Sequence, residues 1–576
     1  MAKAEASVEE LVGMIERGEL RLPEMQRQYV WRSTRVRDLL DSLYRGYPSG
    51  AILLWETDEV VPLQNMAIAQ QVNPYQSTRL LLDGQQRLTS LSAVIRGEPV
   101  MVRGRKKPLD LLFNLEHPDV LTTVTEVDED ADGDEVDDDE DVVGDEADAS
   151  EDELLKRFNQ MTFVVATKKL EQLPQWVKVS EVFKSTSNNT FLKRAKITSF
   201  DDPRTDKYSQ RLDRLRNIRK YVYRMDVLER TLSYDEVTEI FVRVNSLGAK
   251  LRSSDLALAQ ITAKWRHSLQ TFIGFQAECA KLGFDLELGL HLKNLIVFAT
   301  GQSRFNTVSS LSLPTLQKGW KESGEGMHFA MNFLKSNVGI DSPALLASPF
   351  LIIVLAYFGH ARGYKISPEE ESLLRYWTLL ANTKARFSRG SSESLLDQDL
   401  STLKNGGTVQ ELIDRLRQQV GRLDITADEL EGRNQRSALF KTMFLAFRAD
   451  GAKDWHSNLA ISLDHSGVQH RLQFHHIFPK ALLTKNSFTP READDISNLA
   501  FIGGKTNRAI SDKPPVEYLL TLVDKHGVDL FKSQAIPTTK VLLETASYKA
   551  FLIERRKLIA SKLNEFIGNP KSVVSG

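Results

Sequence analysis

Short apolar segments bounded by turn residues alternate with amphipathic segments over the first 265 residues. Apolar runs of this length predict strands, here at residues 51–55, 79–82, 109–115, 161–166 and 221–227. Apolar positions with a helical period predict helices at residues 34–44, 88–95 and 235–244. Ser233 and Glu236 have the spacing of a capping box before the last of these helices, in which Val244 is expected in the core. Helices and strands are therefore mixed in the N-terminal part.

The pattern becomes mainly helical from residue 266 to residue 450. Helices are predicted there at residues 350–357, 371–385 and 408–423. After residue 451 an extended segment at 469–474 precedes loops rich in His, Asn and Gly, and a helix is predicted at 548–566. The chain is thus expected to be a predominantly helical α+β protein with domains at 1–265, 266–450 and 451–576.

Composition excludes several classes of protein. The chain has 576 residues and one cysteine, Cys279, so an internal disulfide and a cysteine-based zinc site are ruled out. The longest apolar run, residues 350–358, is much shorter than the about 20 residues of a membrane-spanning helix. Residues 1–18 lack the basic and then apolar pattern of a signal peptide. We therefore expect a cytoplasmic protein with no membrane partner.

Acidic residues are concentrated in one segment, residues 126–153. It holds 18 of the 77 acidic residues and no Lys or Arg, so the rest of the chain has a formal charge of +16. A segment of this charge is expected to be a disordered insertion in the first domain. The acidic segment either solubilises the protein or competes with a polyanion for binding to the basic rest of the chain. The excess of basic residues outside this segment suits a nucleic-acid partner.

Two adjacent histidines, His475 and His476, begin the densest group of chemical residues. Asn498 follows His476 by 22 residues, and Asn507 follows Asn498 by 9. A neutral imidazole takes a proton from water at physiological pH, and phosphodiester hydrolysis needs such a base together with a cation. Adjacent strand residues point to opposite faces, so the histidines should have different roles. The alternative is a surface His pair with two turn asparagines.

This passage resembles the HNH nuclease motif, which implies a C-terminal β-β-α-metal domain. The resemblance makes His475 a metal ligand, His476 the general base and Asn507 a second ligand through its carbonyl oxygen. Asn498 would hold the loop behind the hairpin. An imidazole and an amide oxygen completed by water and phosphate suit Mg²⁺ or Mn²⁺.

A second candidate site begins with Asp83 and ends with Arg87, between a predicted strand and helix. Backbone N–H groups at such a helix start attract phosphate, Gly84 permits a positive φ or a close approach, and Arg87 can bind phosphate oxygens. Asp83 could bind phosphate-associated Mg²⁺, and Gln85 or Gln86 could orient water or a base. The alternative is an ordinary turn in which Asp83 caps the helix.

Three segments, residues 22–31, 83–87 and 241–251, together resemble the ParB/sulfiredoxin-like domain of GmrSD-type restriction proteins. That resemblance implies an N-terminal α/β domain that binds and hydrolyses GTP or ATP, fused here to the HNH domain. It adds Gln26, Arg27, Arg243 and Asn245 to the candidate nucleotide-binding residues.

The resemblance implies an NTP-regulated, metal-dependent endonuclease of type IV restriction character that cuts modified double-stranded phage DNA. Glucosylated or hydroxymethylated cytosine and phosphorothioate linkages are all candidate modifications. The alternatives are a non-cutting, NTP-switched DNA sensor and a nuclease or nickase that recognises phosphorothioate DNA. The sequence does not determine the oligomeric state, and a homodimer remains one option.

Overall fold

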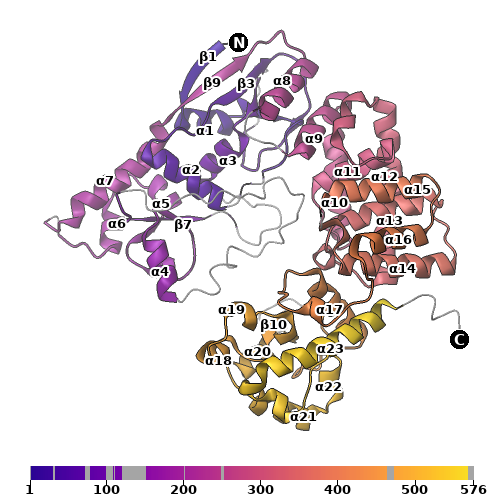
Figure 1. Ribbon diagram of the computed structural model, residues 1–576. Coiled ribbons are helices and arrows are strands. Elements are labelled where there is room, and N and C mark those ends of the chain that lie inside the picture. Colours follow the sequence, from indigo (N-terminus) through magenta and orange to yellow (C-terminus); the bar gives the residue numbers. More distant parts are fainter. Residues whose placement is uncertain are drawn as a thin grey trace. The chain divides into compact units, whose positions relative to one another are not determined.

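The computed structural model describes residues 2–29, 31, 33–71, 78–98, 108, 110–119, 151–199, 201–247, 252–388, 390–463 and 472–568. The chain divides into two compact units, Met1–Thr271 and Phe272–Gly576, each with its own buried clusters (Figure 1). The expected predominantly helical α+β class is confirmed. The predicted domain boundaries at residues 265 and 450 stay predictions.

The first unit is built on a six-stranded mixed sheet with the order β1-β9-β3-β5-β2-β4. Pairs β2–β5 and β3–β9 are parallel, and the other neighbours are antiparallel. The strands are β1 (Ala2–Ser7), β2 (Leu20–Pro23), β3 (Ile52–Thr57), β4 (Leu63–Gln64), β5 (Thr78–Asp83) and β9 (Val222–Leu228).

Both faces of the sheet are covered because its central strands are apolar on both sides. Ile52 and Leu54 of β3 join one buried cluster, and the alternate residues Leu53 and Trp55 join another. Helices α1 (Val8–Glu16), α2 (Ser33–Arg45) and α3 (Gln85–Arg96) cover the first face. Helices α8 (Tyr234–Leu247) and α9 (Ser253–Lys264) cover the second.

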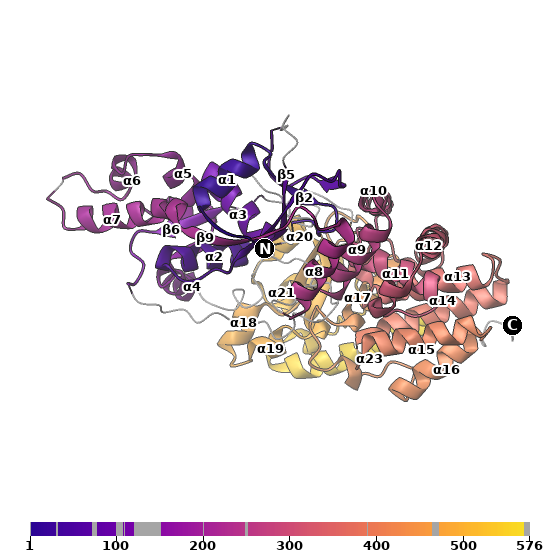
Figure 2. The same ribbon diagram turned by 90° about the horizontal axis from the view of Figure 1, so that it is seen from above.

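A smaller antiparallel sheet, with the order β7-β6-β8, lies with α5–α7 at one end of this unit (Figures 1 and 2). Its elements are β6 (Leu111–Asn114), α4 (Glu151–Asn159), β7 (Phe163–Val165), β8 (Trp176–Lys178), α5 (Val179–Lys184), α6 (Asn189–Arg194) and α7 (Arg204–Arg216). Residues 126–150 of the acidic segment lie outside the described residues, and its last three residues begin α4.

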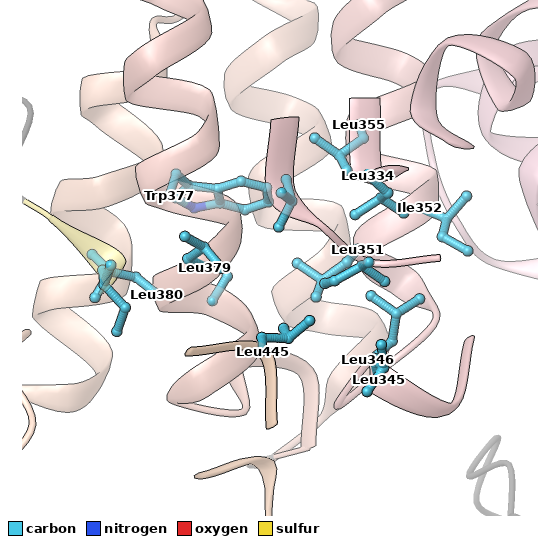
Figure 3. Packing of buried hydrophobic residues seen from close by; sticks show 14 of the residues in the cluster. Leu334, Leu345, Leu346, Leu351, Ile352, Leu355, Trp377, Leu379, Leu380 and Leu445 are labelled. Carbon is cyan, nitrogen blue, oxygen red and sulfur yellow. The ribbon is translucent and has the colours of Figure 1, made fainter. Parts of the chain in front are cut away.

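Helices make up the first part of the second unit. They are α10 (Ser268–Lys281), which begins just before the unit boundary, α11 (Leu288–Thr300), α12 (Leu313–Phe333), α13 (Phe350–Ala361), α14 (Pro368–Thr383), α15 (Ser392–Lys404), α16 (Val409–Val420) and α17 (Ala438–Ala449). Leu351, Trp377 and Leu445 come from three different helices and meet in one core (Figure 3).

Among the residues described after α17, two strands and six α-helices follow. They are β10 (Leu472–His476), α18 (Lys480–Lys485), α19 (Pro490–Ala493), β11 (Leu499–Gly503), α20 (Gly504–Ile510), α21 (Pro515–His526), α22 (Asp529–Lys532) and α23 (Tyr548–Ile567). Phe440 of α17 packs against Phe474 of β10 and Phe501 of β11, with ring centroids 5.0 and 4.9 Å apart. The strand pair therefore shares a core with the preceding helices.

The elements predicted from apolar patterns are confirmed with small shifts of their ends. The capping box of α8 is present, since Ser233 and Glu236 exchange both hydrogen bonds. Residues 469–471 of the predicted extended segment lie outside the described residues, and 472–474 begin β10. The core position expected for Val244 is wrong because 47% of the residue is exposed on α8.

A buried ion pair joins α15 to the segment after α14. Arg386 donates from Nε to Asp399 Oδ2 at 2.6 Å and from Nη1 to Gln419 at 2.8 Å. The side chains of Arg386 and Asp399 are 1% and 0% exposed. Because both charges are desolvated, removing one leaves the other without compensation.

We predict that Asp399→Ala lowers the free energy of unfolding by about 3 to 5 kcal/mol, because Arg386 loses its buried counter-charge. Thermal melting followed by circular dichroism measures this loss. The control is Asp424→Ala, which breaks an exposed pair with Arg422 and should change the melting temperature little. Equal shifts for the two variants would contradict the prediction.

Candidate active site

Strands β10 and β11 pair with each other, and helix α20 follows β11 directly, whereas α18 and α19 lie between the two strands in the chain; β10 and α20 are labelled in Figure 1. The strands are antiparallel, with His475 opposite Ala500 and His476 opposite Leu499. Helix α20 starts directly after β11 because Gly503 ends the strand as the N-cap residue. Asp454 fixes this junction by accepting hydrogen bonds from Gly503 N at 2.7 Å and Thr506 Oγ1 at 2.8 Å.

His475 lies buried between the strand and helix α20, with 3% of the residue exposed. Its Nδ1 is 2.8 Å from Asn507 Oδ1, and its Nε2 is 3.1 Å from the Tyr518 hydroxyl. Burial lowers the pKa of His475 to about 4, with a smaller contribution from nearby His476. The ring of His475 is therefore neutral at physiological pH. His475 and Asn507, the two residues expected to share a metal, are in direct contact.

His476 makes a separate set of contacts. Its Nε2 lies 2.8 Å from Asp494 Oδ1, and the other carboxylate oxygen of Asp494 lies 2.9 Å from Lys480 Nζ. A quarter of the His476 side chain is exposed. The two histidines therefore have different surroundings, as the opposite orientation of adjacent strand residues requires.

Asn498 holds the loop that follows His476. The residue is fully buried, and its Oδ1 accepts from Phe478 N at 2.9 Å while its Nδ2 donates to Phe478 O at 3.0 Å. The same Nδ2 donates to Ala493 O at 2.9 Å. One amide group thus joins the segment after β10 to the end of α19.

Gly84 forms the turn between β5 and α3. Its φ is +97°, in the left-handed region, and a Cβ at this position would lie 2.4 Å from Ile52 Cδ1. Only glycine fits such a turn without strain. Gly84 is also the N-cap residue of α3, so the alternative in which Asp83 caps the helix is wrong.

Gln85 and Gln86 bind the segment before α2. Gln85 Nε2 donates to Arg27 O at 3.0 Å, and Gln86 Nε2 donates to Gln28 O at 3.2 Å. Gln86 Oε1 accepts from Trp31 N at 3.2 Å. Gln26 reaches the same turn by donating to Leu81 O. The structure therefore brings Gln26, Arg27, Gln28 and Trp31 into contact with the end of β5 and the start of α3.

The guanidinium of Arg87 donates hydrogen bonds to oxygen atoms of neighbouring residues in the first unit. It donates to Ser49 O, to Ala51 O at 2.7 Å and to Asp83 Oδ2 at 3.0 Å. Its side chain is 13% exposed, whereas that of Asp83 is 46% exposed. Asp83 is thus the more accessible of these two charged groups.

The remaining candidates have other partners. Arg27 Nη1 pairs with Asp255 Oδ2 on α9 at 2.8 Å. Arg243 pairs with Glu239 one turn earlier on α8, and 72% of its side chain is exposed. Asn245, a candidate nucleotide-binding residue, is buried and donates to the carbonyl of Phe241 in its own helix.

Sequence reasoning missed Asp494 and Tyr518, which contact the two histidines. A signal for Asp494 was present, because Thr489 and Glu492 have capping-box spacing and so indicate a short helix that ends near it. No spacing rule places Tyr518 beside His475, since that contact depends on the packing of α21.

Comparison with known families identifies the N-terminal part. Residues 8–262 match the family described as the GmrSD restriction endonuclease, N-terminal domain. This part of the chain is therefore similar to the N-terminal domain of GmrSD restriction endonucleases, and a type IV restriction nuclease is the class that the match supports.

A relative covers nearly the whole chain. It is the uncharacterized protein MJ0686 of Methanocaldococcus jannaschii, 24% identical over 575 residues, which span 93% of this chain and 90% of the relative. Among the described residues, no helix combines the length and apolarity needed to cross a membrane.

Proposed function

We propose that β10, β11 and α20 form a metal-dependent, HNH-type site that cuts modified double-stranded phage DNA in the cytoplasm. We further propose that the N-terminal domain regulates cutting by binding and hydrolysing GTP or ATP. The family match supports a restriction nuclease. One observation carries the assignment of the site: His475 Nδ1 and Asn507 Oδ1, the two atoms expected to share a metal, lie 2.8 Å apart.

The hydroxyl of Tyr518 has a single proton and donates it to Ile477 O at 2.9 Å. If His475 carries its proton on Nδ1, Asn507 Oδ1 is satisfied, but Nε2 faces a hydroxyl whose proton is already used. If the proton is on Nε2, the Tyr518 oxygen accepts it, and Nδ1 and Asn507 Oδ1 become two acceptors facing each other at 2.8 Å. A cation held by both atoms would resolve this second arrangement.

The donors fit a hard divalent cation. Neighbouring ligands of octahedral Mg²⁺, with bonds of about 2.1 Å, lie about 3 Å apart, close to the 2.8 Å separation of Nδ1 and Oδ1. Within the described residues, no three His, Cys, Asp or Glu side chains group as a metal site. His475 and Asn507 would therefore hold Mg²⁺ or Mn²⁺ together with water and phosphate, and the ion would neutralise charge that builds on the phosphate.

His476 supplies the base in this proposal. Water attacks phosphorus, its proton passes to the imidazole of His476, and the bond from phosphorus to the leaving oxygen breaks. The ring is partly exposed, so a water can reach it. Asn498 holds the end of β10 in place through its hydrogen bonds to Phe478, which lies two residues after His476. The formal charge of +16 outside the acidic segment favours a DNA substrate.

Asp83 is the group we assign to the nucleotide. It lies at the carboxyl end of β5, beside the backbone turn at Gly84, where a phosphate and its Mg²⁺ could bind. Gln85 and Gln86 shape this turn through the carbonyls of Arg27 and Gln28, and Arg87 does so through those of Ser49 and Ala51. Gln26, Arg27, Arg243 and Asn245 remain predictions of the family resemblance.

We predict that His476→Ala lowers the rate of plasmid nicking by at least about 10²-fold, because the base that accepts the water proton is lost. The assay uses Mg²⁺ or Mn²⁺, plain and modified plasmids, and reactions with and without GTP or ATP. His328→Ala, at a partly exposed histidine of the same unit, should nick at the parental rate. Equal nicking by the His476 variant would remove His476 from the mechanism, and no nicking by the parent would favour the non-cutting sensor.

Asn507→Ala should weaken Mn²⁺ binding by about tenfold or more, because one of two protein ligands is lost. Titration calorimetry with Mn²⁺ alone measures the affinity without any need for cutting. Asn405→Ala, at an exposed asparagine, is the matched control. Unchanged Mn²⁺ affinity in the Asn507 variant would contradict the assignment.

Asp83→Ala should lower the affinity for labelled GTP or ATP by about tenfold or more, because the carboxylate no longer binds the phosphate-associated Mg²⁺. Filter binding of the labelled nucleotides is the measurement. Asp58→Ala removes an exposed carboxylate of the same unit and should leave binding unchanged. If the Asp83 variant binds nucleotide as well as the parent protein, the assignment of a nucleotide site to residues 83–87 is wrong, and these residues only form a structural turn.

A further inference from the structure

The contact between His476 and Asp494 has the geometry of an oriented imidazole. Nε2 of His476 lies 2.8 Å from Asp494 Oδ1, and Lys480 Nζ lies 2.9 Å from Asp494 Oδ2. Both carboxylate oxygens therefore have a partner. Burial opposes ionisation of Asp494, but the hydrogen bonds from His476 and Lys480 outweigh it and hold the pKa of this carboxyl below its usual value.

Asp494 is fixed from both sides along the chain. The carbonyl of Ala493 accepts from Asn498 Nδ2, the amide that also binds Phe478. On the other side, Asp495 is almost fully buried, and its Oδ2 accepts from Arg556 Nη2 at 2.7 Å and from Gly432 N at 2.9 Å. The carboxylate of Asp494 thus approaches the ring of His476 from a rigid position.

An ionised carboxylate only accepts hydrogen bonds, so the proton of a neutral His476 ring must be on Nε2. Nδ1 then carries the lone pair. A carboxylate in this position also compensates the positive ring that forms when the base takes a proton, as in hydrolases that pair Asp with His.

We propose that Asp494 is a positioning residue that fixes the ring of His476 so that Nδ1 receives the proton of the attacking water. This inference rests on the proposed nuclease function. The competing explanation is that Asp494 only stabilises the end of α19, where it is the C-cap residue. A purely structural contribution would not depend on the identity of residue 476.

A double-mutant cycle separates these explanations. Asp494→Asn should lower kcat for plasmid nicking by about 10²-fold and leave KM within about twofold, because the ring loses its orientation and its counter-charge. In a His476→Ala background the same substitution should cause no further loss. Asp529→Asn is the control, because it alters an exposed carboxylate that also pairs with a lysine, Lys532. A loss of equal size in both backgrounds would overturn the proposal.

The tautomer of His476 gives a test that needs no cutting. Nitrogen NMR is recorded on the full chain with labelled histidines, and the signal that disappears in His476→Gln is assigned to His476. In the parent protein we expect the proton of this ring on Nε2. The Asp494→Asn variant should contain a mixture of both tautomers. If the ring of His476 in the parent protein carries its proton on Nδ1, the proposed role of Asp494 is wrong, whatever the nuclease activity. If the parent protein does not nick plasmid, the proposed nuclease function is wrong instead.

Discussion

The amide of Asn498 is the constraint on which the C-terminal site depends. Its three side-chain hydrogen bonds join Phe478, which follows the two histidines, to Ala493, which precedes Asp494. Because the residue is fully buried, water cannot replace these bonds at low cost. One side chain therefore links the segment that follows His476 to the segment that precedes Asp494.

The surrounding core makes this site part of a larger body. Phe474 and Phe501, from the two strands, pack against Phe440 of the last helix before them. Arg555 of α23 is buried and donates to the carbonyls of Ser497 and Leu499 on either side of Asn498. A movement of α17 or α23 would thus be transmitted to the strand pair that carries the proposed nuclease site.

Periodicity predicted most elements of the fold, because the central strands alternate between two buried faces and the helices have regular apolar stripes. The proximity of His475 and Asn507 followed from the resemblance to strand–strand–helix nucleases. Asp494 could not be predicted in the same way, since its approach to His476 depends on the path of α18 and α19. The contacts of Arg87 could not be predicted from the sequence either. An arginine after a glycine turn suggests phosphate binding, whereas its hydrogen bonds to Ser49 and Ala51 are known only from the structure.

The central claim is that His475 and Asn507 together hold a divalent cation. Anomalous diffraction at the manganese edge from crystals soaked in Mn²⁺ tests it directly. We expect a peak about 2.0 to 2.3 Å from both His475 Nδ1 and Asn507 Oδ1, with the ring proton on the Tyr518 side. Density without a peak at this position, with the two side chains still in direct hydrogen-bond contact, would contradict it.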